Sequence, residues 1–274
     1  MPSDMGVLIW WRALSAIALV NMAAWGLSAS AHARRDYPDP AEKAWWRRQL
    51  ILSAGFVFGC AFRSFLPRAD VQRICLYDSW LSSVLVGRSV ATVAELCFMA
   101  QMALHLRRLA ERNGATFSLA LSRLIVPIIV VAETCSWYAV LTTNYLGNSC
   151  EESLWATAAA LLLLGCAALW PRCDARSRRL LTIPFVAGPG YLLFMAAVDI
   201  PMYLTRWQAD RAAGRAYLSV SAGLHDLATR WVVTRQWQDW RAEMPWMTLY
   251  FSVAVWISLA LATPSRASQA EPGA

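Results

Sequence analysis

Three carboxylates lie inside long apolar stretches of this chain, where a membrane-spanning segment normally has none. They are Glu95, Glu133 and Asp199. An ionisable group at bilayer depth costs roughly 3 kcal/mol or more, so it tends to face the protein interior, to pair with another group and to mark a working site. The sequence therefore indicates where the protein works more clearly than what it does, because no motif names a reaction.

The composition is that of a membrane protein. Hydrophobic residues make up 58% of the chain and charged residues 16%, whereas about a quarter of a soluble domain is charged. The uncharged runs 13–31 and 244–263 approach or reach the ~20 residues that a helix needs to cross ~30 Å of hydrocarbon. Backbone groups in lipid must pair internally, and the alternation of a barrel strand is absent, so helices are expected. The predicted fold class is an all-α integral membrane protein.

We expect one polytopic membrane domain over 1–274, a bundle of about seven transmembrane helices. A segment over about 208–243 repeats apolar residues at helical spacing, which predicts an amphipathic interfacial helix or a lid over the bundle. Residues 264–274 are expected to form a disordered tail. Pro184, Pro189 and Pro201 predict a broken or kinked sixth span. The spans are predicted at about 7–30, 47–66, 80–106, 118–143, 153–170, 180–205 and 244–262.

The basic residues, which give a net charge of +7, gather at segment ends and in loops. Topology and anionic headgroups explain them, so we expect membrane lipids as partners and no nucleic acid. The loops after spans one, three and five are rich in Arg, whereas 142–152 holds two acids and no cation. The positive-inside rule then places the N-terminus outside and the C-terminus in the cytoplasm, with the Arg-containing 206–243 connection as an exception. The strong preference for Arg over Lys suggests a bacterial inner (plasma) membrane.

The first span has two interpretations. Ala31-His32-Ala33 resembles a signal-peptidase site. Cleavage there would leave Arg34 and Arg35 outside, against the charge rule, so an uncleaved span is favoured.

Helical spacing brings polar groups of several spans to a common depth. Arg88 lies one to two turns from Glu95 on one face, and Asp199, Tyr203 and Arg206 align on another span. We expect Glu95, Glu133 and Asp199 to share a cavity in the outer half, with Arg88 within salt-bridge reach. The cytoplasmic half is expected to hold almost no intramembrane polar group. The predicted catalytic residues are Glu95, Glu133, Asp199 and Arg88, and the predicted substrate-binding residues are Asn144, Tyr203, Arg206, His225 and Arg230.

Absent motifs narrow the chemistry. The chain has three His residues, which excludes a histidine-box di-iron site, and no metal ligand set is predicted. It also lacks a Gly-rich phosphate loop, a nucleophile elbow and a CxxC motif, so no cofactor can be named. Cys75 and Cys150 fall in predicted outer loops, where they could form a disulfide or remain two free thiols.

The leading hypothesis is a membrane-embedded enzyme with an outward-facing carboxylate and Arg site. It would act on a lipid or amphipathic substrate, as a hydrolase or group transferase by default. Glu133 or Asp199 would be the general acid or base, and Arg88 or Arg206 would bind an anionic headgroup.

Two other hypotheses remain. A proton-coupled transporter or channel-like protein would use the same acids, and it ranks second because the cytoplasmic half should be nearly apolar. A sensor or structural subunit of a membrane complex is the third. In a purely structural alternative to all of these, the charged pairs only fix the register of the helices against one another. Protein partners and oligomeric state do not follow from the sequence.

Overall fold

The computed structural model describes residues 2–263, apart from the side chains of residues 2–4, 176, 179, 180 and 183. The predicted tail at 264–274 lies outside the described residues. Six helices in the described part are long and apolar enough to cross a membrane, so the chain is an all-α integral membrane protein that contacts lipid. These helices cover Met5–Ala33, Val84–Arg112, Thr116–Thr142, Tyr145–Arg172, Pro184–Ala212 and Met244–Ala262.

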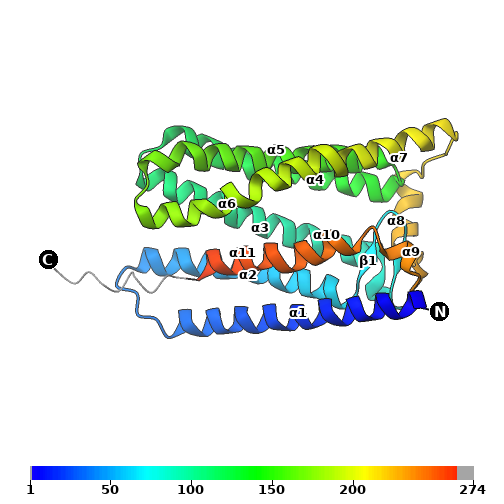
Figure 1. Cartoon of the computed structure of the whole chain (residues 1–274), viewed down its shortest axis with the longest axis horizontal. Helices are drawn as coiled ribbons and strands as arrows, with labels where there is room; N and C mark the ends of the chain where they lie inside the picture. Colours follow the sequence, from blue (N-terminus) through cyan, green and yellow to red (C-terminus); the bar gives the residue numbers. More distant parts are fainter. Residues whose placement is uncertain (1, 264–274) are drawn as a thin grey trace.

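The helices run back and forth along one bundle (Figure 1). The central helix α3 packs between α2 and α4, while α1 and α11 flank α2, and α5 packs against α4 and carries α6 and α7. The first five helices are α1 (Pro2–Ala33), α2 (Pro40–Phe65), α3 (Val84–Arg112), α4 (Thr116–Thr142) and α5 (Tyr145–Leu169). The sixth run consists of α6 (Ala175–Phe194), the π-helical turn η3 (Met195–Asp199) and α7 (Ile200–Ala212). The last run consists of α10 (Met244–Leu249), the π-helical turn η4 (Tyr250–Ala254) and α11 (Val255–Ala262).

One end of the bundle, here called the capped end, is covered by short elements (Figure 1). Strand β1 (Arg68–Ala69) pairs antiparallel with β2 (Ile74–Cys75), and β2 pairs parallel with β3 (Val232–Val233). The other elements there are the 3₁₀ turn η1 (Trp80–Ser82) and the helices α8 (Val220–Thr229) and α9 (Trp237–Trp240). The opposite end is formed by the turn after α1, the α3–α4 turn and the 3₁₀ turn η2 (Trp170–Arg172) after α5.

The 208–243 connection is only partly helical. It contains the end of α7, then α8, β3 and α9. Leu227 and Trp240 are fully buried, so this segment is packed onto the capped end. Strands of two residues carry no periodicity, so they cannot be predicted from a hydrophobic pattern.

Helix α5 begins at Tyr145, well before the predicted span at 153. Thr143 takes a left-handed conformation, with φ 59°, and ends α4, and the Asn144 side chain then accepts a hydrogen bond from the Leu146 N–H and caps α5. The predicted loop at 142–152 is therefore wrong for Glu151. It lies in the second turn of α5 and is buried.

The sixth run is interrupted just before Pro201, and not at Pro184 or Pro189. The chain stays α-helical through Pro184 and Pro189. The π-helical turn that ends at Asp199 comes directly before Pro201, whose ring nitrogen has no hydrogen to donate to the preceding turn. Asp199 therefore lies where the helix widens.

Of the two alternatives for Cys75 and Cys150, the structure contradicts the disulfide. Cys75 and Cys150 are both free thiols. Cys75 is buried, and its thiol donates to the Tyr77 carbonyl at 3.3 Å. Cys150 is exposed and belongs to the first turns of α5 instead of a loop beside β2.

Helices α2 and α3 approach closely through small residues. A Cβ at Gly55 would lie 2.6 Å from the Cys97 Sγ, and one at Gly59 would lie 2.6 Å from the Ala94 Cβ. A pair of glycines four residues apart is a known device for close packing of helices in lipid. This contact places the polar face of α2 against α3.

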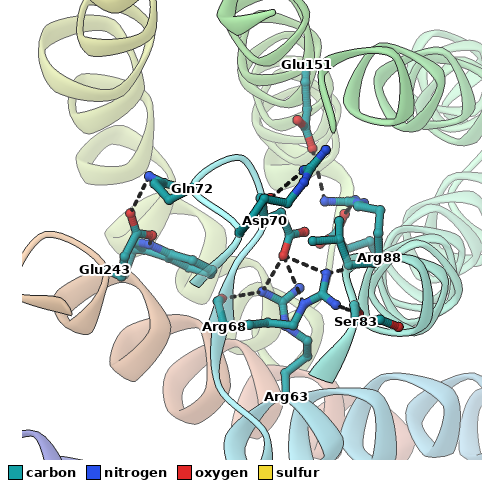
Figure 2. A network of polar contacts seen from close by, with 12 residues as sticks. Arg63, Arg68, Asp70, Gln72, Ser83, Arg88, Glu151 and Glu243 are labelled. Atoms are coloured by element: carbon teal, nitrogen blue, oxygen red, sulfur yellow. Dashed lines mark hydrogen bonds and ion pairs between the residues drawn. The ribbon is translucent and has the colours of Figure 1, made fainter. Parts of the chain in front are cut away.

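A buried ion network joins the capped end to the bundle (Figure 2). Arg68 donates to Asp70 Oδ1 from Nε at 3.0 Å and from Nη2 at 2.8 Å, and it also donates to the carbonyls of Ser83 and Val84. Arg63 lies 3.6 Å from the same carboxylate oxygen. Burial alone would raise the pKa of Asp70, but the guanidinium groups of Arg68 and Arg63 outweigh it and hold that pKa well below its usual range.

We expect Asp70→Asn to destabilise the protein by about 3–5 kcal/mol, because it leaves two buried guanidinium groups without their carboxylate. Thermal unfolding in detergent measures this loss, with the exposed Asp36→Asn as the control. Because the folded pKa of Asp70 is lowered, its contribution is complete above the unfolded pKa of about 4 and disappears only as pH falls below that value. Equal unfolding temperatures for Asp70→Asn and Asp36→Asn would contradict this assignment.

Candidate acid–base site

Arg88 lies at the centre of a buried cluster formed by three helices. Its Nη2 donates to Glu95 Oε2 at 2.7 Å and to Glu133 Oε2 at 2.6 Å. Its Nη1 lies 3.6 Å from Glu151 Oε1. The side chains of Arg88, Glu133 and Glu151 are at most 8% exposed, and that of Glu95 is 15% exposed. The predicted contact of Arg88 with an intramembrane carboxylate is therefore confirmed, and it involves two of the three expected carboxylates.

Neighbouring polar groups fix the orientation of the carboxylates. The Thr92 hydroxyl donates to Glu133 Oε2 at 2.6 Å, and the Trp137 ring N–H donates to the Thr92 oxygen at 3.1 Å. The Asn148 amide donates to Glu151 Oε2 at 3.3 Å. Each acid is thus oriented by a group on its own or a neighbouring helix, which is the arrangement that a preorganised site needs.

The cluster contains more carboxyl groups than cations. Glu95, Glu133 and Glu151 would carry three negative charges against the single positive charge of Arg88. Two unit charges about 5 Å apart repel by about 3 kcal/mol at an effective dielectric constant of 20. Glu95 and Glu133 both contact the same Arg88 nitrogen, so their carboxyl groups lie close together. One cation therefore faces three acids, an arrangement in which interacting carboxyl groups titrate together.

The same three carboxylates could also hold a metal ion, because one oxygen from each lies within 4.8 Å of the others. Oxygen ligands of this kind suit Mg²⁺ or Ca²⁺. The Arg88 guanidinium already supplies positive charge to all three groups. The geometry therefore favours proton chemistry over metal binding.

Asp199 is not part of the Arg88 cluster. It lies in η3, and its main electrostatic neighbours are Glu243 and Arg206. Glu152, next to Glu151 on α5, interacts electrostatically with Asp199. Asp199 is therefore adjacent to the cluster, but it makes no direct ion pair with Arg88 among the described residues.

The predicted substrate-binding residues separate into different places. Tyr203 stacks on Tyr145 with ring centroids 6.3 Å apart, and the Arg206 guanidinium lies 5.7 Å and 5.8 Å from the centroids of these two rings. Asn144 is used as the cap of α5. The remaining two predicted residues, His225 and Arg230, are exposed on α8, where Arg230 pairs with Asp226 at 3.4 Å.

Sequence reasoning missed Arg73, which holds α8 against the bundle. Its Nε donates to Asp226 Oδ2 at 2.8 Å, and its Nη2 donates to the Val140 carbonyl at 2.6 Å. Arg73 is 4% exposed and takes a left-handed backbone conformation, with φ 57°. A loop Arg gives no sign of such burial, because its partners come from parts of the chain far apart in sequence.

The half of the bundle away from the cap was expected to be nearly apolar, and that expectation is wrong. Gln49, Ser53, Gln101 and Ser258 are fully buried beyond the Arg88 cluster, toward the opposite end. The Gln101 amide donates to the Ser258 carbonyl at 2.9 Å, and the Ser258 hydroxyl lies 2.7 Å from Gln101 Oε1 and 3.0 Å from Ser53 Oγ. These side chains carry no charge, so they do not stand out in an apolar run as ionisable residues do.

No protein-family model, no curated protein and no solved structure matches this chain. Its function is therefore argued from the geometry of the site.

We expect Arg88→Gln to destabilise the protein by about 3–5 kcal/mol, because it leaves three buried carboxyl groups without a cation. Adding Glu133→Gln should recover part of this loss, since it removes one of the uncompensated acids. Thermal unfolding of the two single variants and the double variant gives the coupling energy.

Arg107→Gln is the matched control, because Arg107 and Glu111 form an exposed pair at 2.7 Å and exposed pairs contribute little. Strictly additive losses for Arg88→Gln and Glu133→Gln would contradict the shared cluster.

Proposed function

We propose that the Arg88 cluster is the acid–base site of a membrane-embedded enzyme that acts on a lipid or another amphipathic substrate. The observation that supports this most directly is the gathering of three buried carboxyl groups, those of Glu95, Glu133 and Glu151, around a single guanidinium group. One carboxyl group can give a proton to the substrate while the other, as a carboxylate, accepts one. Arg88 can stabilise negative charge that develops on the reacting group.

The position of the site suits a substrate that comes from the membrane. Glu95 has the most exposed carboxyl group of the three, at 15% against 5% for Glu133 and 7% for Glu151. Arg206, with Tyr145 and Tyr203, provides a cation near the capped end for an anionic headgroup. A hydrolase or a group transferase remains the default reaction class.

We further propose seven membrane crossings, with α2 as the one that composition does not identify. The start of α1 contacts Trp237 of α9, and α3 follows η1, so both helices begin at the capped end. Because α1 runs to the opposite end, α2 must run back to the capped end. Its first turns carry Arg47 and Arg48, which lower its hydropathy and lie at the end opposite the cap.

The distribution of charge favours a cytoplasmic location for the opposite end in a bacterial inner membrane. The positive-inside rule counts Arg and Lys in short loops, and these loops are basic. The N-terminus would then lie outside and the C-terminus in the cytoplasm. The basic residues of α1–α2, α3 and α5–α6 near this end include Arg34, Arg35, Lys43, Arg107, Arg108, Arg112, Arg172 and Arg178.

Labelling of Cys150 tests this orientation. Cys150 is the exposed thiol of the capped end, so a membrane-impermeant maleimide should label it in intact cells. Cys150→Ser should lose that label. Labelling that requires permeabilised cells would reverse the proposed orientation without affecting the cluster.

A proton-coupled transporter is the second candidate. A nearly apolar inner half would argue against it, but Gln49, Ser53, Gln101 and Ser258 are buried there. Polar groups in both halves are what a translocation pathway needs. A comparison of lipid and metabolite pools in cells with and without the protein separates the two candidates, since an enzyme changes covalent structures whereas a transporter changes their distribution.

Glu133→Gln should abolish the change in lipid or metabolite pools that the wild-type protein causes. The rate of the reaction should fall about 100-fold or more, because the amide keeps the volume of the side chain and removes its acid–base role. Asp199→Asn should also abolish the pool change if Asp199 acts on the substrate from the adjacent site. Glu111→Gln, at an exposed acid of α3, is the matched control.

The amount of folded protein in the membrane is measured in parallel for these variants. A pool change that persists in Glu133→Gln, together with reduced stability, would show that the cluster only fixes helix packing.

A further inference from the structure

Two faces of α2 and α3 carry the same sequence of chemical types along the bundle. On α2, Gln49, Ser53, Phe56 and Cys60 recur at i, i+4, i+7 and i+11, which places them on one helical face. All four are at most 2% exposed. On α3 the corresponding order, from the capped end, is Glu95, Phe98, Gln101 and His105. Each helix therefore presents polar groups on both sides of an aromatic residue.

The polar layer near the opposite end has hydrogen-bonding capacity that the protein does not fill. Gln49 is fully buried, yet both its Oε1 and its Nε2 lack a protein partner. Ser258 has one hydroxyl hydrogen, which it can donate to Ser53 or to Gln101 but not to both. An unpaired buried amide costs about 1–3 kcal/mol. Water can donate to Oε1 and accept from Nε2, so water is the ligand that suits this layer.

Aromatic side chains separate this layer from the Arg88 cluster. Phe56 and Phe98 are stacked, with ring centroids 4.3 Å apart and an interplanar angle of 13°. Tyr250 packs edge-on against Phe56 at 5.5 Å. The Tyr250 hydroxyl is buried without a hydrogen-bond partner, and Glu95 and Cys60 are its first electrostatic neighbours. The spacing of Glu95 and Gln101 along α3 is about 9 Å, so the apolar break is short.

We propose that this α2–α3–α11 interface is a proton path between the Arg88 cluster and the opposite end, and that the stacked Phe56 and Phe98 rings are its gate. A proton would pass along water and the Ser258 hydroxyl, with the Gln101 amide holding the water in place by hydrogen bonds. It would cross when the rings separate and water enters, and that water would link it through the Tyr250 hydroxyl to Glu95. Each water or hydroxyl oxygen accepts one proton and gives up another, so no other reactant is needed. An apolar constriction of this kind closes a path by keeping water out.

At the opposite end of the bundle, the path ends at His105. Its Nε2 lies 2.8 Å from the Leu261 carbonyl, so this nitrogen carries the hydrogen. Trp45 contacts the His105 ring at 4.7 Å, and Arg108 lies 3.9 Å over the Trp45 ring, at the basic end of the bundle. This inference rests on the proposed function, since it supplies an exchangeable proton to the same acid–base site from the other side of the membrane.

Proton flux into liposomes tests the path. The purified protein is reconstituted with a pH-sensitive dye inside, and a potassium diffusion potential drives protons inward. Phe98→Leu should raise the flux about tenfold over the wild type, because it removes the stacked ring that keeps water out. Gln101→Leu, added to Phe98→Leu, should return the flux to the wild-type level. Phe117→Ala, which removes an exposed ring from α4, is the matched control.

A flux in Phe98→Leu no higher than in Phe117→Ala would overturn the gate. A raised flux that Gln101→Leu leaves unchanged would overturn the path, because the protons would then use another route. Phe56→Leu, on the facing helix, gives the same reading if Phe98→Leu does not fold.

The readout is independent of enzyme activity. Failure of this test with Glu133→Gln still inactive would remove the path and leave the acid–base site. A persistent pool change in Glu133→Gln with the flux results as expected would remove the enzyme proposal and leave a proton-conducting protein.

Discussion

The guanidinium group of Arg88 is the interaction on which the interior of this bundle depends. It brings together acids from α3, α4 and α5, each of which would be costly in the membrane without a cation. One cation cannot neutralise three carboxylates, so the cluster must hold protons as well. The proposed acid–base chemistry would draw on these protons, because a carboxyl group that cannot be paired with the cation can hold one and give it up.

The buried network at the capped end fixes the position of Arg88 in this cluster. Asp70 interacts electrostatically with Arg88 as well as with Arg68 and Arg63. Gly87 makes room for Arg68, since a Cβ there would lie 2.4 Å from its guanidinium carbon. The start of α3, and hence Arg88, is therefore fixed by the same buried network that closes the end of the bundle. Changes in the cap should alter the cluster even where they touch none of its members.

Much of the helical layout could be predicted from the sequence, because long uncharged runs leave few alternatives in a membrane. Arg88, Glu95 and Glu133 were found for the same reason, since a charge in such a run stands out. Glu151 was missed because the end of α4 depends on a left-handed Thr143 and an Asn144 cap, which a hydropathy pattern does not reveal. Arg73 and Asp70 were missed as partners because their contacts join segments far apart in the chain.

The uncharged polar layer changes how the acids should be interpreted. An enzyme with an isolated site would gain nothing from buried amides and hydroxyls about 9 Å deeper in the bundle along α3, and an orphaned Gln49 amide would be a cost without compensation. α2 packs closely on α3 at Gly55 and Gly59, and it is not among the six helices that are apolar enough to be identified as membrane spans. This helix thus carries the polar face that continues inward from the cluster. This arrangement follows if the site exchanges protons with the far side of the membrane, whether it uses them for catalysis or for transport.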